Sequence, residues 1–292
     1  MRRDQPELAA CGLQADHERQ ALPPSETLEV HPGARRRLPS SLCKPSLRTH
    51  FDWDDSWNDD YARRPVLLDL FAGAGGAAFG YFLAGFRVVG VDLAPQPHYP
   101  FEFHQADALE YVAEHGREFD AIHASPPCQD HMRAGQHPSH GTGWMLAAAR
   151  DLLAAQSSPW VIENVPGAPM RVDFLLCGCQ FGLRLRRERW FETSWHGFQL
   201  RSPHDHSGPP VVSVVGHGTP TWVRDRWIEV FGHSPKIADY RAAMGIDWMN
   251  RDELSQAIPP AYTEFIGTQL MVALDYAKRT RETLDAVRDG RL

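Results

Sequence analysis

Apolar residues in this chain gather in short runs that are separated by turns and helical stretches. Residues 66–92 read VLLDLFAGAGGAAFGYFLAGFRVVGVD, which is an apolar run, a glycine-rich turn, a stretch rich in alanine and aromatic residues, and a second apolar run. Such runs, bounded by turn residues, are typical of buried strands, and a strand–helix–strand unit implies parallel strands with a right-handed crossover. We therefore predict a βαβ unit here.

The same alternation continues to about residue 194. FHQADALEYVAEHG predicts a short strand and a helix that starts near Asp107, FDAIHAS a buried strand, GTGWMLAAARDLLAAQ a helix, and PWVIENV another strand. Strands that alternate with helices favour a parallel sheet covered on both faces. The predicted fold class is α/β, with a doubly wound, mostly parallel sheet in a domain over residues 61–194.

The flanking segments differ from this domain. Residues 1–60 show no sustained hydrophobic period and several proline-rich stretches, so we expect a mostly disordered N-terminal extension. Residues 195–243 are rich in histidine, glycine and proline, with one short β-like run at 211–215, and are expected to form a small inserted region. Residues 244–292 regain helical character and are expected to pack back on the sheet.

Composition and charge exclude some classes of protein. The chain has 292 residues, 42% of them hydrophobic, enough for one large domain or a domain with a smaller partner. It has no apolar run near the roughly 18 residues of a membrane helix and no apolar signal-peptide stretch, so we expect a cytoplasmic protein without membrane association. The net charge of −7 argues against a protein held to nucleic acid by bulk charge alone.

The cysteines favour a reducing compartment. Five of them, at positions 11, 43, 128, 177 and 179, are odd in number and irregular in spacing, unlike a disulfide framework. Cys177 and Cys179 have one residue between them, and no second cysteine pair is present to complete a zinc site. We interpret the two as small apolar packing residues, and no metal is expected.

Cys128 has a more constrained position. It follows Pro126 and Pro127 at the end of the predicted strand FDAIHAS, and prolines cannot extend a hydrogen-bonded ladder. Each proline fixes its own φ and biases the preceding residue away from helix, so the chain leaves the strand stiffly. Ligands of open α/β sheets bind at the carboxyl ends of the strands, and Cys128 is presented there.

The glycine-rich turn and two aspartates belong to the same predicted edge. Gly73, Gly75 and Gly76 let the backbone turn sharply and approach a ligand, and the helix N-terminus behind them favours a carboxylate or phosphate. Asp92, at the end of the second strand, could accept hydrogen bonds from ribose hydroxyls. Asp92 could equally serve a turn, and Asp107 could equally cap the next helix.

Glu163 adds a carboxyl group to this edge. It follows an apolar run that predicts a buried strand. Burial of a lone carboxyl group would raise its pKa, which suits a proton donor. Two neighbouring strands would then direct a thiol and a carboxyl group into one cleft, beside a nucleoside-type cofactor.

Taken together, these features resemble the cytosine-C5 DNA methyltransferase family. The resemblance spans about residues 66–270, and the pair SPPC and ENV in this order is highly specific. It implies a Rossmann-like methyltransferase domain with a reduced target-recognition region at 195–243. The matching motifs are DLFAGAGG (69–76), VD (91–92), AD (106–107), SPPCQ (125–129), ENV (163–165), RRER (186–189) and QAIPP (256–260).

The resemblance implies roles for the catalytic residues. Cys128 would attack C6 of a cytosine that is flipped out of the duplex, and Glu163 would hold N3 and N4 of the base and supply a proton. Asn164 would buttress the site. Arg187 and Arg189 would lie near it, with Arg189 contacting the cytosine O2. Methyl transfer to C5 and loss of the C5 proton would then expel the thiol.

The resemblance also implies S-adenosylmethionine as cofactor and double-stranded DNA as partner of a monomeric enzyme. Phe71 would stack on the cofactor adenine, Asp92 would take the ribose hydroxyls, and Asp107 the adenine amino group. The other implied cofactor-binding positions are Asp69, Gly73, Gly75, Gly76 and Pro126.

Departures from the family pattern leave the substrate open. Leu185, two residues before Arg187 of the R-x-R pair, stands where the family usually has glutamine, and SQAIPP lacks a Gly-Asn step. Methylation of RNA or of a free cytosine nucleotide is one alternative, and a catalytically idle nucleic-acid-binding relative is another. The presence of both Cys128 and Glu163 disfavours the idle relative. A nicotinamide dehydrogenase is disfavoured because no G-x-G-x-x-G motif is present.

Overall fold

A computed structural model describes residues 60–127, 141, 143–195, 197, 204–207, 211–212, 214, 221–289 and 291. The expected N-terminal extension lies outside the described residues, except for its last residue. Cys128 and residues 213 and 215 of the β-like run at 211–215 also lie outside them. Among the described residues, no helix combines the length and hydrophobicity that crossing a membrane requires.

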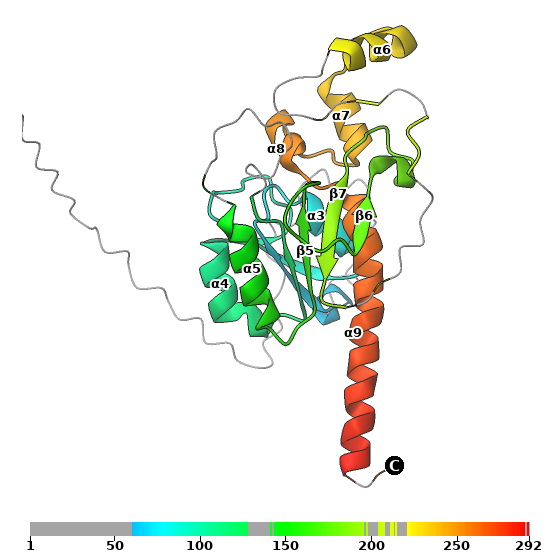
Figure 1. Ribbon diagram of the computed structural model, residues 1–292. Coiled ribbons are helices and arrows are strands. Elements are labelled where there is room, and N and C mark those ends of the chain that lie inside the picture. Colours follow the sequence, from blue (N-terminus) through cyan, green and yellow to red (C-terminus); the bar gives the residue numbers. More distant parts are fainter. Residues whose placement is uncertain are drawn as a thin grey trace, which may run out of the picture. The chain divides into compact units, whose positions relative to one another are not determined.

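The described residues form a seven-stranded sheet in the order β3-β2-β1-β4-β5-β7-β6 (Figure 1). β1 to β5 are parallel to one another, whereas β7 runs antiparallel to both β5 and β6. This confirms the predicted doubly wound, mostly parallel α/β sheet. The strands are β1 (Val66–Leu70), β2 (Arg87–Asp92), β3 (Glu102–Gln105), β4 (Ala121–Ala124), β5 (Trp160–Asn164), β6 (Phe174–Leu176) and β7 (Arg189–Thr193).

Helices cover both faces of this sheet (Figure 1). α3 and α9 bury apolar side chains against one face, and α4 and α5 against the other. Three more helices follow β7 in the chain before α9. The helices are α3 (Gly76–Leu83), α4 (Ala108–His115), α5 (Trp144–Ala154), α6 (Thr221–Phe231), α7 (Ile237–Met244), α8 (Arg251–Gln256) and α9 (Pro260–Arg288), with 3-10 turns η2 (Gly116–Glu118) and η4 (Gly178–Phe181).

Side chains of the central strands alternate strictly between the two faces. In β1, Leu67 packs under α3 and α9, whereas Leu68 and Leu70 pack under α4 and α5. In β5, Val161 faces the α3 side and Ile162 the other side. Period-2 alternation continues this pattern, so the buried polar residues at positions 69, 123 and 163 all lie on the α3 face.

The inserted region differs from its prediction. Instead of one short β-like run, the described part contains α6 and α7, and the run contributes a single bridge between Leu185 and Val212. The expected boundary at 243/244 falls before the last residue of α7 (Ile237–Met244) and stays a prediction. Trp227, Met244 and Leu254, from α6, α7 and α8, are buried in one hydrophobic cluster, so these helices pack across that boundary.

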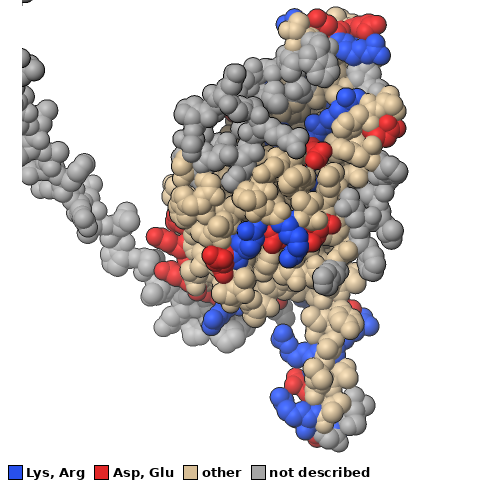
Figure 2. All heavy atoms as spheres, in the orientation of Figure 1, with Lys and Arg blue, Asp and Glu red and all other residues tan. Residues whose placement is uncertain are grey.

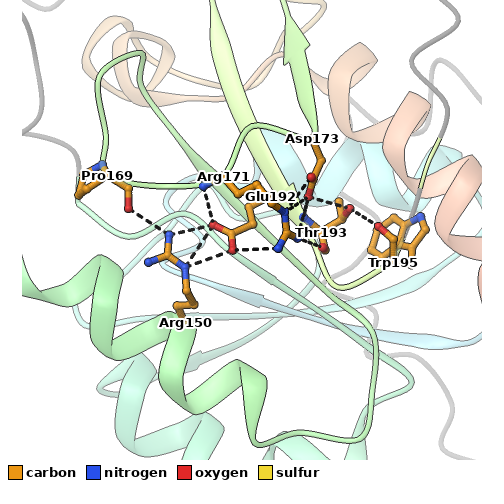
Figure 3. A network of polar contacts seen from close by, with 7 residues as sticks. All are labelled: Arg150, Pro169, Arg171, Asp173, Glu192, Thr193 and Trp195. Carbon is orange, nitrogen blue, oxygen red and sulfur yellow. Dashed lines mark hydrogen bonds and ion pairs between the residues drawn. The ribbon is translucent and has the colours of Figure 1, made fainter.

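A network of polar contacts holds the reversed strand β7 in place (Figure 3). Glu192 on β7 is only 4% exposed, and its carboxylate accepts a hydrogen bond from Arg150 Nη2 of α5 at 2.8 Å. Next to it, Asp173 accepts from the Thr193 backbone N–H at 2.8 Å and pairs with Arg171 at 2.8 Å. The network therefore ties β7 to α5 and to the chain that enters β6.

The crossing of α3 and α9 leaves no room for side chains at its centre. Thr263 of α9 donates its hydroxyl proton to the Ala77 carbonyl oxygen of α3 at 2.9 Å. A Cβ on Gly80 would overlap both Thr263 Oγ1 and the Pro260 carbonyl oxygen. Glycine at position 80 thus lets α9 close over the sheet.

Gly80→Ala is expected to lower the free energy of unfolding by about 1–3 kcal/mol, because the added methyl group overpacks the crossing. The higher helix propensity of alanine alone would instead raise the free energy of unfolding by about 1 kcal/mol. Urea denaturation monitored by circular dichroism measures the difference. Thr268→Ala, on an exposed position of α9, is the control and should change stability little. An unchanged or raised stability of Gly80→Ala would contradict the close-packed crossing.

Candidate active site

The carboxyl ends of β1 and β4 flank the point where the strand order reverses, since β2 lies on one side of β1 and β4 on the other. Ligands of open α/β sheets bind at this edge. Because β7 is antiparallel, its first residue, Arg189, lies at the same edge as the last residues of β5. The site residues predicted from the sequence can therefore be compared along one edge of the sheet.

The turn after β1 has an unusual backbone. Phe71, Gly73 and Gly75 all have positive φ, of 59°, 49° and 86°. A Cβ on Gly75 would lie 2.7 Å from Pro100 Cδ, and one on Gly76 would lie 2.6 Å from the Ile258 carbonyl oxygen, so packing explains these two glycines. At Gly73 a Cβ would meet nothing within 4 Å among the described atoms. Gly73 is thus the glycine that borders open space.

The turn ends at the N-terminus of α3, and no side chain among the described residues caps it. Gly75 is the N-cap, and the first turn of the helix carries no acidic residue. The positive end of the helix dipole and its unsatisfied N–H groups therefore remain available to an anion, such as a carboxylate.

Asp92 supports this turn. Its Oδ2 accepts a hydrogen bond from the Gly73 N–H at 2.9 Å, and its Oδ1 accepts one from the Ala94 N–H at 3.0 Å. The side chain remains partly exposed at the end of β2. These are the contacts of a turn residue, and a carboxylate has further lone pairs with which to accept hydroxyl groups from a ligand.

Asp69 lies beneath the turn rather than in it. It is 1% exposed, and Tyr99 donates its hydroxyl proton to Asp69 Oδ2 at 3.3 Å. Burial raises the pKa of Asp69 well above its usual range, the Asp92 charge raises it further, and the Tyr99 hydrogen bond opposes the rise. The side chain offers almost no surface to a ligand, and its expected part in cofactor binding stays a prediction.

Asp107 caps α4. Its Oδ1 accepts hydrogen bonds from the Leu109 N–H at 2.8 Å and the Glu110 N–H at 3.1 Å. These bonds satisfy two of the N–H groups that begin the helix. The structure therefore shows Asp107 as the capping residue of α4. A contact between Asp107 and the cofactor adenine stays a prediction.

Glu163 is the buried carboxyl group at the end of β5. It is 6% exposed, and Arg189 Nε lies 2.8 Å from its Oε1. Burial raises the pKa of Glu163, although the charges of Arg189 and Arg187 and a hydrogen bond with Ser125 oppose the rise. A carboxyl group that keeps its proton to a higher pH than usual, while its orientation is fixed, is suited to donate that proton.

Asn164 fixes the chain that leads to Cys128. Its amide Nδ2 donates to the Pro126 carbonyl oxygen at 3.0 Å, and its Oδ1 accepts from the Val165 N–H at 2.9 Å. Asn164 is 1% exposed and Pro126 is buried. Asn164 therefore holds Pro126 in the turn, and the roles expected of the two residues in the active site stay predictions.

Arg187 makes different contacts from Arg189. Its guanidinium donates to the Val214 carbonyl oxygen at 3.0 Å and to the Ser255 carbonyl oxygen at 2.6 Å. Its own carbonyl oxygen accepts from the Tyr262 hydroxyl at 2.7 Å. Arg187 thereby joins the inserted region, α8 and α9, whereas Arg189 contacts Glu163.

The structure also reveals a buried hydrogen-bonded chain that the sequence analysis missed. The Tyr81 hydroxyl lies 2.9 Å from His123 Nδ1, and His123 Nε2 lies 2.7 Å from Ser125 Oγ. Ser125 in turn bonds to Glu163. The signal was a histidine inside a four-residue apolar strand, on the same face as Glu163 and two residues before the SPP turn.

One arrangement of protons satisfies this whole chain. Burial lowers the pKa of His123 to about 3, so the ring is neutral at physiological pH. Tyr81 then donates to Nδ1, Nε2–H donates to Ser125 Oγ, and Ser125 donates to the Glu163 carboxylate. His123 thus acts as a positioning residue that directs the Ser125 proton toward the carboxyl group.

His123 should make the protein sensitive to acid. Its folded-state pKa is below the ordinary 6.5, so its contribution to stability is full above that pH and is lost as the pH falls toward the folded value. We expect this contribution to drop by on the order of 3 kcal/mol between pH 7 and pH 4.5.

The measurement is urea unfolding at both pH values. The variant His123→Leu/Tyr81→Phe removes both partners without leaving a buried hydroxyl, and it should lose less stability on acidification than the wild type. Tyr81→Phe alone keeps the histidine and should retain the wild-type pH dependence. Equal pH dependence in all three proteins would show that His123 is not the acid-sensitive group.

Comparisons with known proteins were made for sequence and structure. No family model matches the sequence. Two type II methyltransferases of Herpetosiphon aurantiacus, M.HgiDI and M.HgiGI, are each 32% identical to the chain over 117 residues, or 35% of this chain. That alignment spans 37% of M.HgiDI but 90% of M.HgiGI.

Among solved structures, the Dnmt2 methyltransferase of S. pombe covers 72% of this chain with a TM-score of 0.48 and 14% identity. A Dnmt2 mutant of Spodoptera frugiperda covers 71%, with a TM-score of 0.48 and 14% identity. The strand order carries the fold assignment without them. Because 90% of M.HgiGI is matched at 32% identity, the chain belongs to the methyltransferase family that includes this type II enzyme.

Proposed function

We propose that this protein transfers a methyl group from S-adenosylmethionine to C5 of a cytosine in DNA, through a covalent bond between Cys128 and C6. The observation that carries the proposal is the placement of Glu163. It is buried at the end of β5, paired with Arg189 at 2.8 Å, and hydrogen-bonded to Ser125 of the SPP turn that precedes Cys128. The two type II methyltransferase relatives support the reaction class.

The edge of the sheet fits S-adenosylmethionine. The uncapped N-terminus of α3 suits its carboxylate, and Gly73 borders open space beside it. Asp92 would accept hydrogen bonds from the ribose hydroxyls, and Asp107 would accept one from the adenine amino group. Phe71, which follows β1 and is partly exposed, would stack on the adenine ring. When bound, the cofactor supplies an electrophilic methyl group.

The residues of the chain would act on the base in a defined order. The Cys128 thiolate forms a bond to C6 of a flipped cytosine, and Glu163 places its proton at N3, so that negative charge does not accumulate on the ring. C5 becomes nucleophilic and would take the methyl group as the bond between that group and the cofactor sulfur breaks. Loss of the C5 proton to a base and return of the N3 proton to Glu163 then restore the aromatic ring as the Cys128–C6 bond breaks and releases the thiolate.

Arg189 and Ser125 would position the carboxyl group during this sequence. Arg189 binds Oε1, and Ser125 is oriented by His123 and Tyr81 behind it. A carboxyl group held by two partners loses little orientational freedom when a base enters, which favours proton transfer at N3.

The substrate proposal is a short DNA site. On the face drawn in Figure 2, basic and acidic side chains are interspersed rather than gathered in one stripe. In α6, Arg224 pairs with Asp225 at 3.4 Å and Arg226 with Glu229 at 2.9 Å. Each base pair that is read needs its own side chain, and both arginines of α6 have acidic partners, so this part of the described region offers few side chains to read a long site.

The nucleophile is tested by Cys128→Ser. We expect this variant to lose transfer of labelled methyl groups to duplex DNA, since a hydroxyl is a far weaker nucleophile than a thiolate. DNA containing 5-fluorocytosine should trap the wild-type enzyme covalently, because the fluorine cannot leave as a proton. Cys43→Ser is the matched control and should turn over normally. RNA and dCMP are assayed in parallel, and preference for either would redirect the substrate proposal.

Arg189 is expected to set the pKa of Glu163. Its charge is the largest influence that opposes the effect of burial, so Arg189→Gln should raise the pKa of Glu163 further. Arg187→Gln should raise it less. Carboxyl-selective ¹³C NMR titration of labelled protein measures the change, with Glu163→Gln identifying the resonance.

The raised pKa of Glu163 also determines how the stability of the protein changes with pH. A carboxyl group whose pKa is raised above its ordinary 4.5 contributes stability below that pH and loses it as the pH rises through the folded value. Arg189→Gln should therefore steepen the loss of stability above pH 4.5. An unshifted Glu163 resonance would show that the ion pair does not control this carboxyl group.

A further inference from the structure

Four potential metal ligands meet where β6 and η4 adjoin the described part of the inserted region. Their ligand atoms all lie within 4.8 Å of one another. Cys177 precedes η4 and Cys179 lies within it, while His204 and His206 come from residues 204–207. Cys177 Sγ lies 3.5 Å from His206 Nε2, and the two histidine rings are 4.4 Å apart between centroids.

We propose that these four residues bind one zinc ion. Two thiolates and two imidazoles are a ligand set of structural zinc sites. With Zn–S near 2.3 Å and Zn–N near 2.0 Å, a tetrahedral site separates a sulfur from a nitrogen by about 3.5 Å. The separation of Cys177 Sγ and His206 Nε2 agrees with that value.

The surroundings of Cys177 suit a metal-bound thiolate. The side chain is fully buried, and its sulfur accepts hydrogen bonds from the backbone N–H groups of Cys179, Gln180 and Arg187. Burial raises the pKa of the Cys177 thiol, and these hydrogen bonds oppose that rise and fix the direction of the sulfur. Gln180 Oε1 also accepts from the Cys177 backbone N–H at 2.8 Å, which holds the turn that carries both cysteines.

The histidine side of the cluster is held as well. The Arg186 guanidinium donates to the carbonyl oxygen of His206. On the cysteine side, a Cβ on Gly178 would overlap the Leu185 carbonyl oxygen, so the turn between the cysteines packs directly on the chain that leads to β7. Both halves of the cluster are therefore anchored to residues 185–186.

The sequence analysis rejected a zinc site because no second cysteine pair was present. The second pair consists of histidines, with the same one-residue spacing as the cysteines, in a segment distant along the chain. Only the fold brings the two pairs together. The interpretation of Cys177 and Cys179 as apolar packing residues is therefore incomplete.

The position of the cluster indicates what the ion would do. Arg187 donates its N–H to Cys177 Sγ, and two residues later Arg189 contacts Glu163. A zinc ion would tie the histidine segment of the inserted region to this strand and so hold Arg189 in register with β5. With four protein ligands the site is closed, and it has a structural rather than a catalytic role.

Metal content provides the first test. The full chain is produced without a histidine tag and purified without chelators, and zinc is measured by mass spectrometry. We expect one zinc per chain in the wild type, and a fall to near zero in Cys177→Ser and His206→Asn. Cys43→Ser and His104→Asn, outside the cluster, should keep the wild-type content. Wild-type protein that neither retains nor takes up zinc would overturn the proposal.

Cobalt substitution provides the second test and covers variants that fail to fold. Co²⁺ in the wild-type site should give the visible absorption of a tetrahedral ion with thiolate ligands. His206→Cys exchanges one ligand for another, so it should keep the metal and strengthen the thiolate-to-cobalt absorption. A spectrum that this exchange leaves unchanged would place the metal elsewhere. Neither readout depends on methyl transfer, so the outcome is independent of the proposed reaction.

Discussion

The reversal of β7 is the constraint on which the candidate active site depends. A parallel seventh strand would place its first residue at the opposite edge of the sheet, far from the end of β5. The antiparallel strand instead brings Arg189 to the edge where Glu163 and Asn164 lie. The reversed strand also carries a buried carboxylate, Glu192, whose charge is compensated by Arg150 and by the backbone N–H of Arg171 (Figure 3).

Strand alternation explains why so many polar groups are buried on one face. Asp69 and His123 are direct neighbours in the register of β1 and β4. Glu163 lies on the same face of β5, two residues beyond Val161, the residue paired with His123. Tyr99 and Tyr81 satisfy the first two from that face. Glu163 is satisfied by Arg189 and Ser125, so each buried polar group has a partner and the layer is compatible with a folded core.

The sequence predicted what depends on local pattern. Apolar runs located the parallel strands, and short motifs located Glu163, Asn164 and the glycine-rich turn. Contacts between distant segments escaped this reasoning. Arg187, for example, donates to the carbonyl oxygens of Val214 and Ser255. These contacts could not be predicted without knowing where the inserted region and α8 lie relative to Arg187. The helices α6 and α7 were missed because their apolar residues are interspersed with charges, so that burial appears only when three helices pack together.

The position of α9 in the chain has a consequence for how the protein folds. This helix and α3 together cover one face of the sheet. Yet α9 is synthesised after every described strand. While the strands emerge from the ribosome, the apolar residues under α9 have no cover, and they stay accessible until Tyr262, Ile266 and Leu270 arrive. Exposed apolar surface in a partly folded sheet favours aggregation. The speed with which α9 docks on α3 therefore governs how long the newly made chain is at risk.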